Sequence, residues 1–251
     1  MKYIKQFYLS VIVPTYQEEE VIGNTILDIE KYLSKKNFSY EILVVDDGSS
    51  DDTVKIVKKY FSQIKNLRLI NNTKNHGKGF VVRQGLLKAR GAYRLFMDAD
   101  GSTSIKHIDS FLLEFKKGYD LVIGSRSVQG AFIQTHQSRH REIMGDIGNL
   151  MIKIVLSLWK YPDTQCGFKM ITKDAAEKIV SRMTVNRFGF DFEMIVLAEK
   201  MGFKIKQLPV RWINKEDSKV SGIFGPNGFT NVLIDLFKTK IRIIKDDYKI
   251  N

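Results

Sequence analysis

Residues 41–53 of the chain, EILVVDDGSSDDT, place an apolar run directly before a cluster of acidic and small residues. A short run rich in Val, Ile and Leu, bounded by turn residues, is typical of a strand that is buried on both faces of a sheet. Residues 53–64, which follow, repeat apolar side chains at the three- and four-residue spacing of a helix. A strand, a polar turn and a helix form the repeating unit of α/β folds.

The same unit recurs along the first half of the chain. The predicted strands are residues 9–13, 42–45, 67–70, 95–97 and 121–123, and the predicted helices between them are 21–33, 53–64, 79–89 and 105–115. In the second half we predict a helix at 141–159, a strand at 168–171, helices at 174–183 and 192–201, and a further element at 205–213. This alternation predicts an α/β fold with a mostly parallel, Rossmann-like sheet flanked by helices, which binds ligands at the carboxyl ends of its strands.

Length and composition exclude several classes of protein. The 251 residues, 43% of them hydrophobic, fit one folded domain and exclude long disorder. The longest apolar stretch, 147–159, contains Lys153 and is shorter than the about 20 residues that a membrane-spanning helix needs. The single cysteine, Cys166, excludes an internal disulfide. The N-terminus lacks the apolar stretch of a signal peptide, so we expect a cytosolic protein.

The net charge of +12 indicates an anionic partner. Nucleic acid, an acidic membrane surface and a phosphorylated substrate would each fit such a charge. The basic residues are interspersed with acids, and no nucleic-acid-binding motif occurs, so we expect no nucleic-acid partner.

Acidic residues follow three of the predicted strands. Asp46 and Asp47 follow the second, and Glu18 follows the first. Asp98 and Asp100 follow the fourth, and alternate residues of an extended segment point the same way, so both carboxylates can face one site. Such a pair suits Mg²⁺ or Mn²⁺, whose other ligands would be water and the phosphate oxygens of a diphosphate donor. For residues 46–52, a turn or a helix cap is an equally good explanation.

The usual phosphate-binding loops are missing. The sequence has neither a G-x-G-x-x-G motif after a strand nor a G-x-x-x-x-G-K-[ST] motif, which disfavours a dehydrogenase or a P-loop ATPase. Gly77, Lys78 and Gly79 open a predicted helix, where backbone N–H groups and the lysine can meet an anion.

Several motifs together resemble the family 2 glycosyltransferases of the GT-A fold. In the first half these are VIVPTYQE at 11–18, VVDDGSSD at 44–51, NHGKG at 75–79 and DADG at 98–101. In the second half, GSR at 124–126, DTQCGFK at 163–169, FDFE at 190–193, RW at 211–212 and DSK at 217–219 resemble the dolichyl-phosphate glucosyltransferases and mannose synthases within that family.

The resemblance implies transfer of a hexose from a nucleotide-sugar to a polyprenyl or dolichyl phosphate, with inversion at the anomeric carbon. It also implies a donor half at about 1–127 and an acceptor half at about 128–226 within one domain. The mannose synthases usually continue the D-x-D motif with Leu-Gln, whereas Gly101 and Ser102 stand here. This difference favours UDP-glucose over GDP-mannose. Mannose transfer, or another lipid or glycan acceptor, is the alternative.

The resemblance also assigns roles to single residues. Donor-binding positions are Pro14, Tyr16, Glu18, Asp46 and Lys78; acceptor-binding positions are Arg141, Gln165 and Lys169; catalytic positions are Asp98, Asp100, Arg126 and Lys219. Asp98 and Asp100 form the metal-binding D-x-D motif, with Asp100 favoured as the direct ligand. A catalytically inactive relative is disfavoured because all four catalytic positions are present.

A phosphate acceptor needs cations more than a general base, because its second pKa lies near 6 and it is already ionised at pH 7. Asp191 and Glu193 could form a base in relatives that use alcohol acceptors. Alternatively, residues 188–201 form a helix in which Asp191, near the N-terminus, is a cap.

Residues 227–251 form a predicted amphipathic helix, which either packs on the domain or lies in a membrane interface. We expect a protein attached peripherally to the cytosolic face of a membrane.

Overall fold

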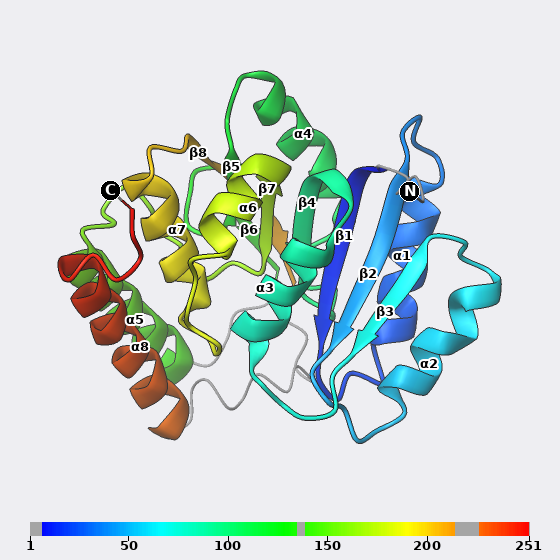
Figure 1. Cartoon of the computed structure of the whole chain (residues 1–251), viewed down its shortest axis with the longest axis horizontal. Helices are drawn as coiled ribbons and strands as arrows, with labels where there is room; N and C mark the ends of the chain where they lie inside the picture. Colours follow the sequence, from blue (N-terminus) through cyan, green and yellow to red (C-terminus); the bar gives the residue numbers. More distant parts are fainter. Residues whose placement is uncertain (1–6, 135–138, 214–225, 251) are drawn as a thin grey trace.

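The computed structural model describes residues 7–134, 139–213 and 226–250, with side chains from residues 143 and 229 onward in the last two ranges. A seven-stranded sheet has the order β3 (Leu67–Asn71), β2 (Tyr40–Asp46), β1 (Phe7–Thr15), β4 (Gly91–Met97), β7 (Phe168–Thr172), β5 (Leu121–Ser125) and β8 (Ile205–Pro209). β7 is antiparallel to β4 and β5, and the other neighbours pair in parallel. The predicted mostly parallel α/β sheet is confirmed (Figure 1).

The strand register brings the acidic segments together. Thr15 at the end of β1 pairs with Asp46 at the end of β2, and Ile12 of β1 pairs with Phe96 near the end of β4. The carboxyl ends of these three strands therefore lie at one edge of the sheet, as parallel pairing requires.

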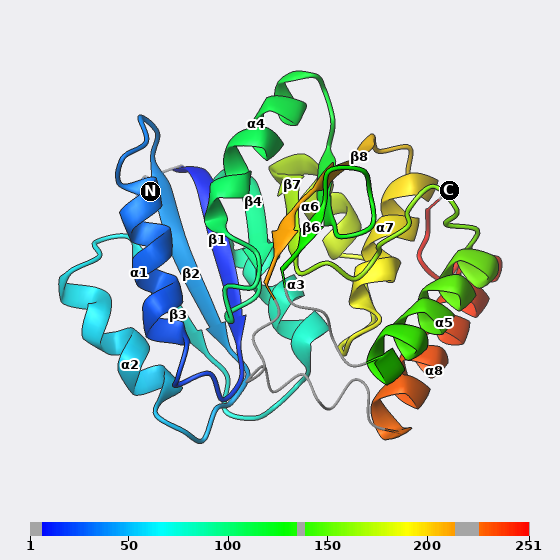
Figure 2. The same cartoon turned by 180° about the vertical axis from the view of Figure 1, so that it is seen from behind.

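Helices cover both faces of the sheet. The front face in Figure 1 carries α3 (Lys78–Lys88), α6 (Lys173–Val180) and α7 (Phe190–Lys200), and the opposite face, seen in Figure 2, carries α1 (Ile22–Leu33), α2 (Thr53–Lys59) and α4 (Ile108–Lys116). The long helices α5 (Arg139–Leu156) and α8 (Pro226–Ile244) lie side by side at one end of the sheet. A small sheet joins β6 (Phe132–Ile133) to β9 (Arg211–Trp212).

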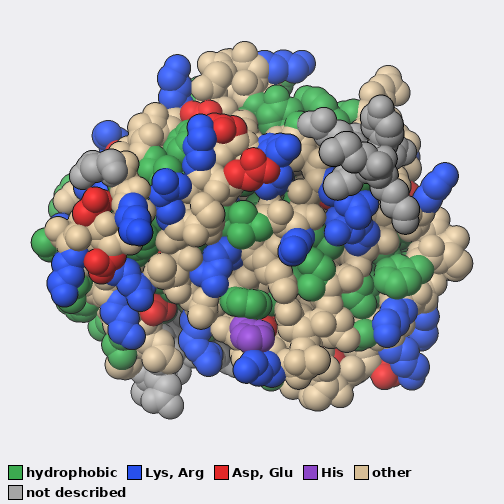
Figure 3. All heavy atoms as spheres, viewed as in Figure 1, with side chains coloured by type: hydrophobic (Ala, Val, Ile, Leu, Met, Phe, Trp, Pro, Cys, Tyr) green, Lys and Arg blue, Asp and Glu red, His purple; other side chains and the backbone are tan. Residues whose placement is uncertain are grey.

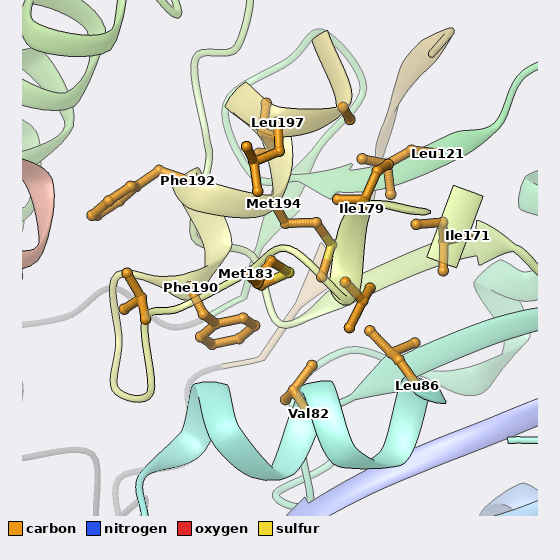
Figure 4. Packing of buried hydrophobic residues seen from close by; sticks show 14 of the residues in the cluster. Val82, Leu86, Leu121, Ile171, Ile179, Met183, Phe190, Phe192, Met194 and Leu197 are labelled. Atoms are coloured by element: carbon orange, nitrogen blue, oxygen red, sulfur yellow. The ribbon is translucent and has the colours of Figure 1, made fainter. Parts of the chain in front are cut away.

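Strand side chains alternate between two cores. Leu9, Val11 and Val13 of β1 enter the core under α1, α2 and α4, whereas Ile12 enters the core under α3, α6 and α7. In the second core, Val82 and Leu86 of α3 face Phe190 and Met183 (Figure 4). The sheet thus runs through both predicted halves, and the donor and acceptor division stays a prediction.

Three helices differ from their predicted bounds. The helix predicted at 53–64 becomes a 3₁₀ turn at Tyr60–Ser62, and the one predicted at 105–115 begins with such a turn at Ile105–His107. The helix predicted at 141–159 ends at Leu156, because Ser157 adopts a φ of 61° that a helix does not allow. Within the described ranges, no helix combines the length and apolar composition needed to cross a bilayer.

The contact between α3 and β1 predicts a specific packing defect. A methyl group at Gly85 would lie 2.4 Å from Cγ2 of Ile12 and 3.0 Å from Cγ2 of Val45, both in the core. We expect Gly85→Ala to lower the free energy of unfolding by about 1–3 kcal/mol, because overpacking forces neighbours to shift. Urea denaturation followed by circular dichroism measures this.

Gly145 of α5 is the matched control, since no heavy atom lies within 4 Å of the same added methyl. Gly145→Ala should stabilise by up to about 1 kcal/mol through helix propensity alone. Equal effects of the two substitutions would contradict the packing argument.

Candidate active site

A cavity of about 440 Å³ opens at the carboxyl ends of β1, β2 and β4. Its lining comes from residues 14–18, Asp47, the segment 75–81, residues 98–100 and residues 187–188. Loops from strands far apart in the sequence therefore meet in one place, as expected for a parallel sheet.

The first wall follows β1 and includes the predicted donor residues Pro14, Tyr16 and Glu18. The backbone N–H of Gln17 donates to Oγ of Ser49 at 2.8 Å, and that of Glu18 donates to Oγ1 of Thr53 at 2.8 Å. A hydroxyl from the turn after β2 and one from the first residue of α2 thus hold this wall in place. Tyr16 is 43% exposed, which leaves its ring available to a ligand.

The two adjacent aspartates after β2 have different positions. Asp46, predicted to bind the donor, is fully buried, and it accepts hydrogen bonds from the backbone N–H groups of Gly48 at 3.0 Å and Ser49 at 2.9 Å. It stabilises its own turn behind the cavity wall. Asp47 lines the cavity instead, and it accepts from the backbone N–H groups of His76 and Gly77, both at 2.8 Å. Burial raises the pKa of the Asp47 carboxyl.

The first turn of α3 forms the second wall and brings Lys78 into the cavity. Gly77 has a φ of 104°, and a methyl group there would lie 2.5 Å from the carbonyl oxygen of Asn186. A methyl group at Gly79 would lie 2.6 Å from the carbonyl oxygen of Val185. These two glycines therefore permit close contact between α3 and the segment 185–187.

Asp98 and Asp100 lie directly after β4 and line the cavity, as predicted. Nζ of Lys78 lies 2.7 Å from Oδ1 of Asp98, and Oδ1 of Asp100 accepts from the backbone N–H of Ser102 at 2.8 Å. Burial, followed by the neighbouring charge of Asp98, raises the pKa of Asp100. The pKa of Lys78 is raised, because burial, which lowers it, is outweighed by Asp98 and Asp191.

The carboxylates fit a divalent metal that is shared with a substrate. Two hard oxygen donors face the cavity, and Mg²⁺ and Mn²⁺ take their remaining ligands from water and phosphate oxygens. Among residues 7–134, 139–213 and 226–250, no group of three or more His, Cys, Asp or Glu side chains could form a metal site without a substrate. Asp98 and Asp100 are the residues that would hold such a metal.

Arg126 forms a two-point ion pair beside the cavity. Its Nε lies 2.8 Å from Oδ2 of Asp163, and its Nη2 lies 2.9 Å from Oδ1. Burial would raise the pKa of Asp163, but Arg126 lowers it to about 2. In the sequence, Asp163 is only the first residue of the motif at 163–169; the structure shows it as the partner of Arg126.

Of the predicted acceptor residues, Gln165 and Lys169 have described side chains, and neither lines the cavity. Lys169 is 1% exposed and donates to the carbonyl oxygen of Cys166 at 2.7 Å and to Asp191, so it lies beneath the site. Gln165 is half-buried, and its backbone N–H donates to Asp163. The side chain of Arg141 and all of Lys219 lie outside the described residues.

The two acids of α7 have structural partners. Asp191 is paired with Lys169, and burial raises the pKa of its carboxyl. Glu193 is fully buried and accepts from Oη of Tyr248 at 2.7 Å and from the backbone N–H groups of Thr184 and Val185, both at 2.9 Å. Neither side chain caps α7, which begins after Gly189.

Several cavity-lining residues have no role in the sequence prediction: Thr15, Gln17, Asp47, Asn75, Val81, Ala99, Arg187 and Phe188. Asn75 opens the motif at 75–79, in which the predicted anion contacts come from residues 77–79. Arg187 and Phe188 are separated from the FDFE segment only by Gly189, and only the fold shows that this region touches the start of α3.

The chain is similar to known glycosyltransferases in both sequence and structure. Residues 10–180 match the model of glycosyl transferase family 2. The chain is 33% identical to dolichyl-phosphate beta-glucosyltransferase ALG5D of Trichomonas vaginalis, over 94% of this chain and 74% of that protein. It is also 33% identical to the dolichyl-phosphate beta-glucosyltransferase of Dictyostelium discoideum, over 98% of this chain and 75% of that protein.

A solved structure with the same fold is the glucosyl-3-phosphoglycerate synthase of Mycobacterium tuberculosis in complex with Mn²⁺, uridine diphosphate and glucosyl-3-phosphoglycerate. Its TM-score is 0.65 at 17% identity, over 93% of this chain and 80% of that one. The likeness shows the fold.

The Arg126–Asp163 pair predicts how stability depends on pH. We expect Asp163→Asn to lower the free energy of unfolding by about 3–5 kcal/mol at pH 7, because it leaves a largely buried guanidinium unpaired. The lowered pKa of Asp163 contributes stability above its ordinary value of 3.8, and this contribution is lost as pH falls towards 2. Urea denaturation at several pH values should therefore show the variant approaching the wild type below pH 4.

Asp174→Asn is the matched control, since Asp174 forms an exposed pair with Lys178 at 2.9 Å. Its loss should cost less than about 1 kcal/mol. A pH-independent gap between Asp163→Asn and the wild type would contradict the prediction.

Proposed function

The chain belongs to glycosyl transferase family 2, and we propose that it transfers glucose from UDP-glucose to the phosphate of a polyprenol such as dolichol, with inversion at the anomeric carbon. The relatives at 33% identity over nearly the whole chain are named for glucose transfer to dolichyl phosphate, which supports both the sugar and the acceptor. The alternative is transfer of mannose from GDP-mannose, or use of another acceptor. An assay that compares the two donors with polyprenyl phosphate distinguishes these activities.

The cavity at the strand ends is the observation that carries the proposal. It combines the Asp98 and Asp100 carboxylates with Lys78 at the N-terminus of α3. When bound, Mg²⁺ or Mn²⁺ would add positive charge for the leaving diphosphate. The α3 dipole and Lys78 stabilise the same negative charge, which grows as the sugar–phosphate bond breaks.

The acceptor needs no general base from the protein. A phosphate oxygen that is already ionised forms the new bond to the anomeric carbon, while the departing diphosphate keeps the electron pair of the broken bond. This agrees with the position of Asp191, which is buried and paired with Lys169 rather than free to accept a proton. Attack from the face opposite the leaving group gives inversion.

The helix pair α5 and α8 supports attachment to a membrane surface. Ile143, Ile147, Leu150 and Ile154 repeat along one face of α5, and Ile234, Phe237, Ile241 and Ile244 along one face of α8, with exposures from 43% to 72%. Val232 and Leu236 of α8 are buried, so this helix packs on the domain with one face and exposes an apolar face on the other.

Basic residues border these apolar faces. Lys153 lies on α5, Lys238 and Lys240 lie on α8 and Lys245 follows it, and Figure 3 shows Lys and Arg side chains beside hydrophobic ones at this edge of the molecule. Trp159, just after α5, is 62% exposed. Exposed apolar residues bordered by lysines bind the interface of an anionic bilayer, so we propose that this surface lies on the cytosolic side of a membrane.

The reaction is tested by incubating the protein with Mn²⁺ or Mg²⁺, UDP-glucose or GDP-mannose, and polyprenyl phosphate. We expect release of UDP that depends on the lipid phosphate, together with a glucosylated lipid. Asp100→Asn should lower the rate by at least about 100-fold and weaken Mn²⁺ binding measured by electron paramagnetic resonance with UDP present, because it removes a charged ligand.

Asp28→Asn, an exposed change on α1, is the matched control and should keep wild-type activity. Turnover of GDP-mannose alone would overturn the sugar assignment. Nucleotide binding without lipid-dependent turnover of either donor would overturn the acceptor.

Membrane attachment is tested by sedimentation with vesicles of phosphatidylglycerol and phosphatidylcholine. We expect Phe237→Glu combined with Ile154→Glu to reduce the bound fraction at least fivefold, since both apolar side chains are exposed and acids are repelled by anionic lipid. Leu113→Glu is the control, because Leu113 is 54% exposed on α4, away from this surface. Unchanged binding of the double variant, or a dimer that the substitutions dissociate, would refute the proposal.

A further inference from the structure

Arg187 is a cation at the cavity that the known motifs leave without a role. It is exposed and lines the cavity together with Phe188. We infer that Arg187 binds the phosphate of the acceptor, an inference that rests on the proposed function.

The other cations near the site have carboxylate partners. Lys78 is 2.7 Å from Asp98, Arg126 is 2.8 Å from Asp163, and Lys169 is paired with Asp191. In the described part of the chain, no carboxylate forms an ion pair with Arg187, and the acid that faces it from α8, Asp235, interacts with it only at longer range. Its guanidinium is therefore available to a ligand, and its planar fork matches the oxygens of a phosphate.

The backbone directly before Arg187 is fixed from several sides, although the side chain of Arg187 is exposed. Glu193 accepts from the N–H groups of Thr184 and Val185, and the N–H of Phe80 in α3 donates to the carbonyl oxygen of Asn186 at 3.0 Å. Arg83 donates to Oδ1 of Asn186 at 3.0 Å. A fixed backbone lowers the entropy that is lost when the side chain closes on a ligand.

The position of Arg187 links the donor cavity to α8. A methyl group at Gly79 would lie 2.8 Å from the carbonyl oxygen of Arg187, which puts this residue beside Lys78. On the other side, a methyl group at Gly189 would lie 2.6 Å from Cβ of Asp235 in α8. The loop that carries Arg187 lies between α3 and α8 in Figure 1. A lipid phosphate whose chain stays at the α8 surface would reach the sugar at this point.

The donor diphosphate could provide the same phosphate chemistry, so the experiment measures both ligands. Arg187→Met and Arg187→Lys are assayed with a water-soluble ten-carbon prenyl phosphate, which removes any effect of membrane binding. We expect Arg187→Met to raise the KM for the prenyl phosphate about 10- to 100-fold, as for loss of a charged hydrogen bond, and Arg187→Lys to recover part of that loss. The Kd of UDP, measured by calorimetry with Mn²⁺, should stay within about twofold.

Arg90→Met is the matched control, because it removes one exposed positive charge next to the start of β4, at the opposite end of this strand from Asp98. It should leave both constants unchanged. An unchanged acceptor KM in Arg187→Met, with or without weaker UDP binding, would overturn the inference. If the wild-type protein transfers no sugar to prenyl phosphate from any donor, the proposed function itself fails, and the wild-type assay detects this separately.

Discussion

The contact between the first turn of α3 and the segment 185–187 joins the two halves of the site. Gly77 and Gly79 bring the helix so close that an added methyl group would overlap backbone oxygens at 2.5 and 2.6 Å. Side chains at either position would separate Lys78 from the wall that contains Arg187 and Phe188. Lys78 and Arg187 thus line one cavity, and its width depends on the absence of two Cβ atoms.

Charge pairing beneath this cavity explains how so many ionised groups are kept near one another. Lys169 and Asp191 are buried together, and Arg126 and Asp163 form a two-point pair close by. An unpaired charge in such a place would shift its pKa or destabilise the fold, whereas a paired one keeps its charge. The pairs keep the electrostatic field around Asp98 and Lys78 fixed before a substrate arrives, which is the condition for stabilising a transition state without reorganisation.

Periodicity was sufficient to predict the α/β fold and the strand-end location of Asp98 and Asp100, because both follow from local pattern and from parallel pairing. It could not place β7 antiparallel between β4 and β5, since strand order depends on long-range packing. Nor could it separate Asp46 from Asp47: adjacent aspartates are equivalent in sequence, and only the turn geometry directs one inwards and the other to the cavity. Lys169 was predicted to bind the acceptor because it lies in a motif of the family. The sequence does not show that its side chain is buried and paired with Asp191, which lies 22 residues further along the chain.

A lipid substrate poses a geometric problem that the arrangement of α8 addresses. The sugar donor is water-soluble, while the acceptor phosphate cannot move far from the bilayer that holds its chain. α8 exposes Phe237 and Ile241, and its Asp235 contacts the turn at Gly189, two residues from Arg187. The same helix also reaches Glu193 through the following Tyr248, and Glu193 holds residues 184 and 185. The segment 184–189, which contains Arg187, is therefore built on the helix with the apolar surface, so a lipid held at this surface would bring its phosphate to the cavity wall that faces the nucleotide-sugar.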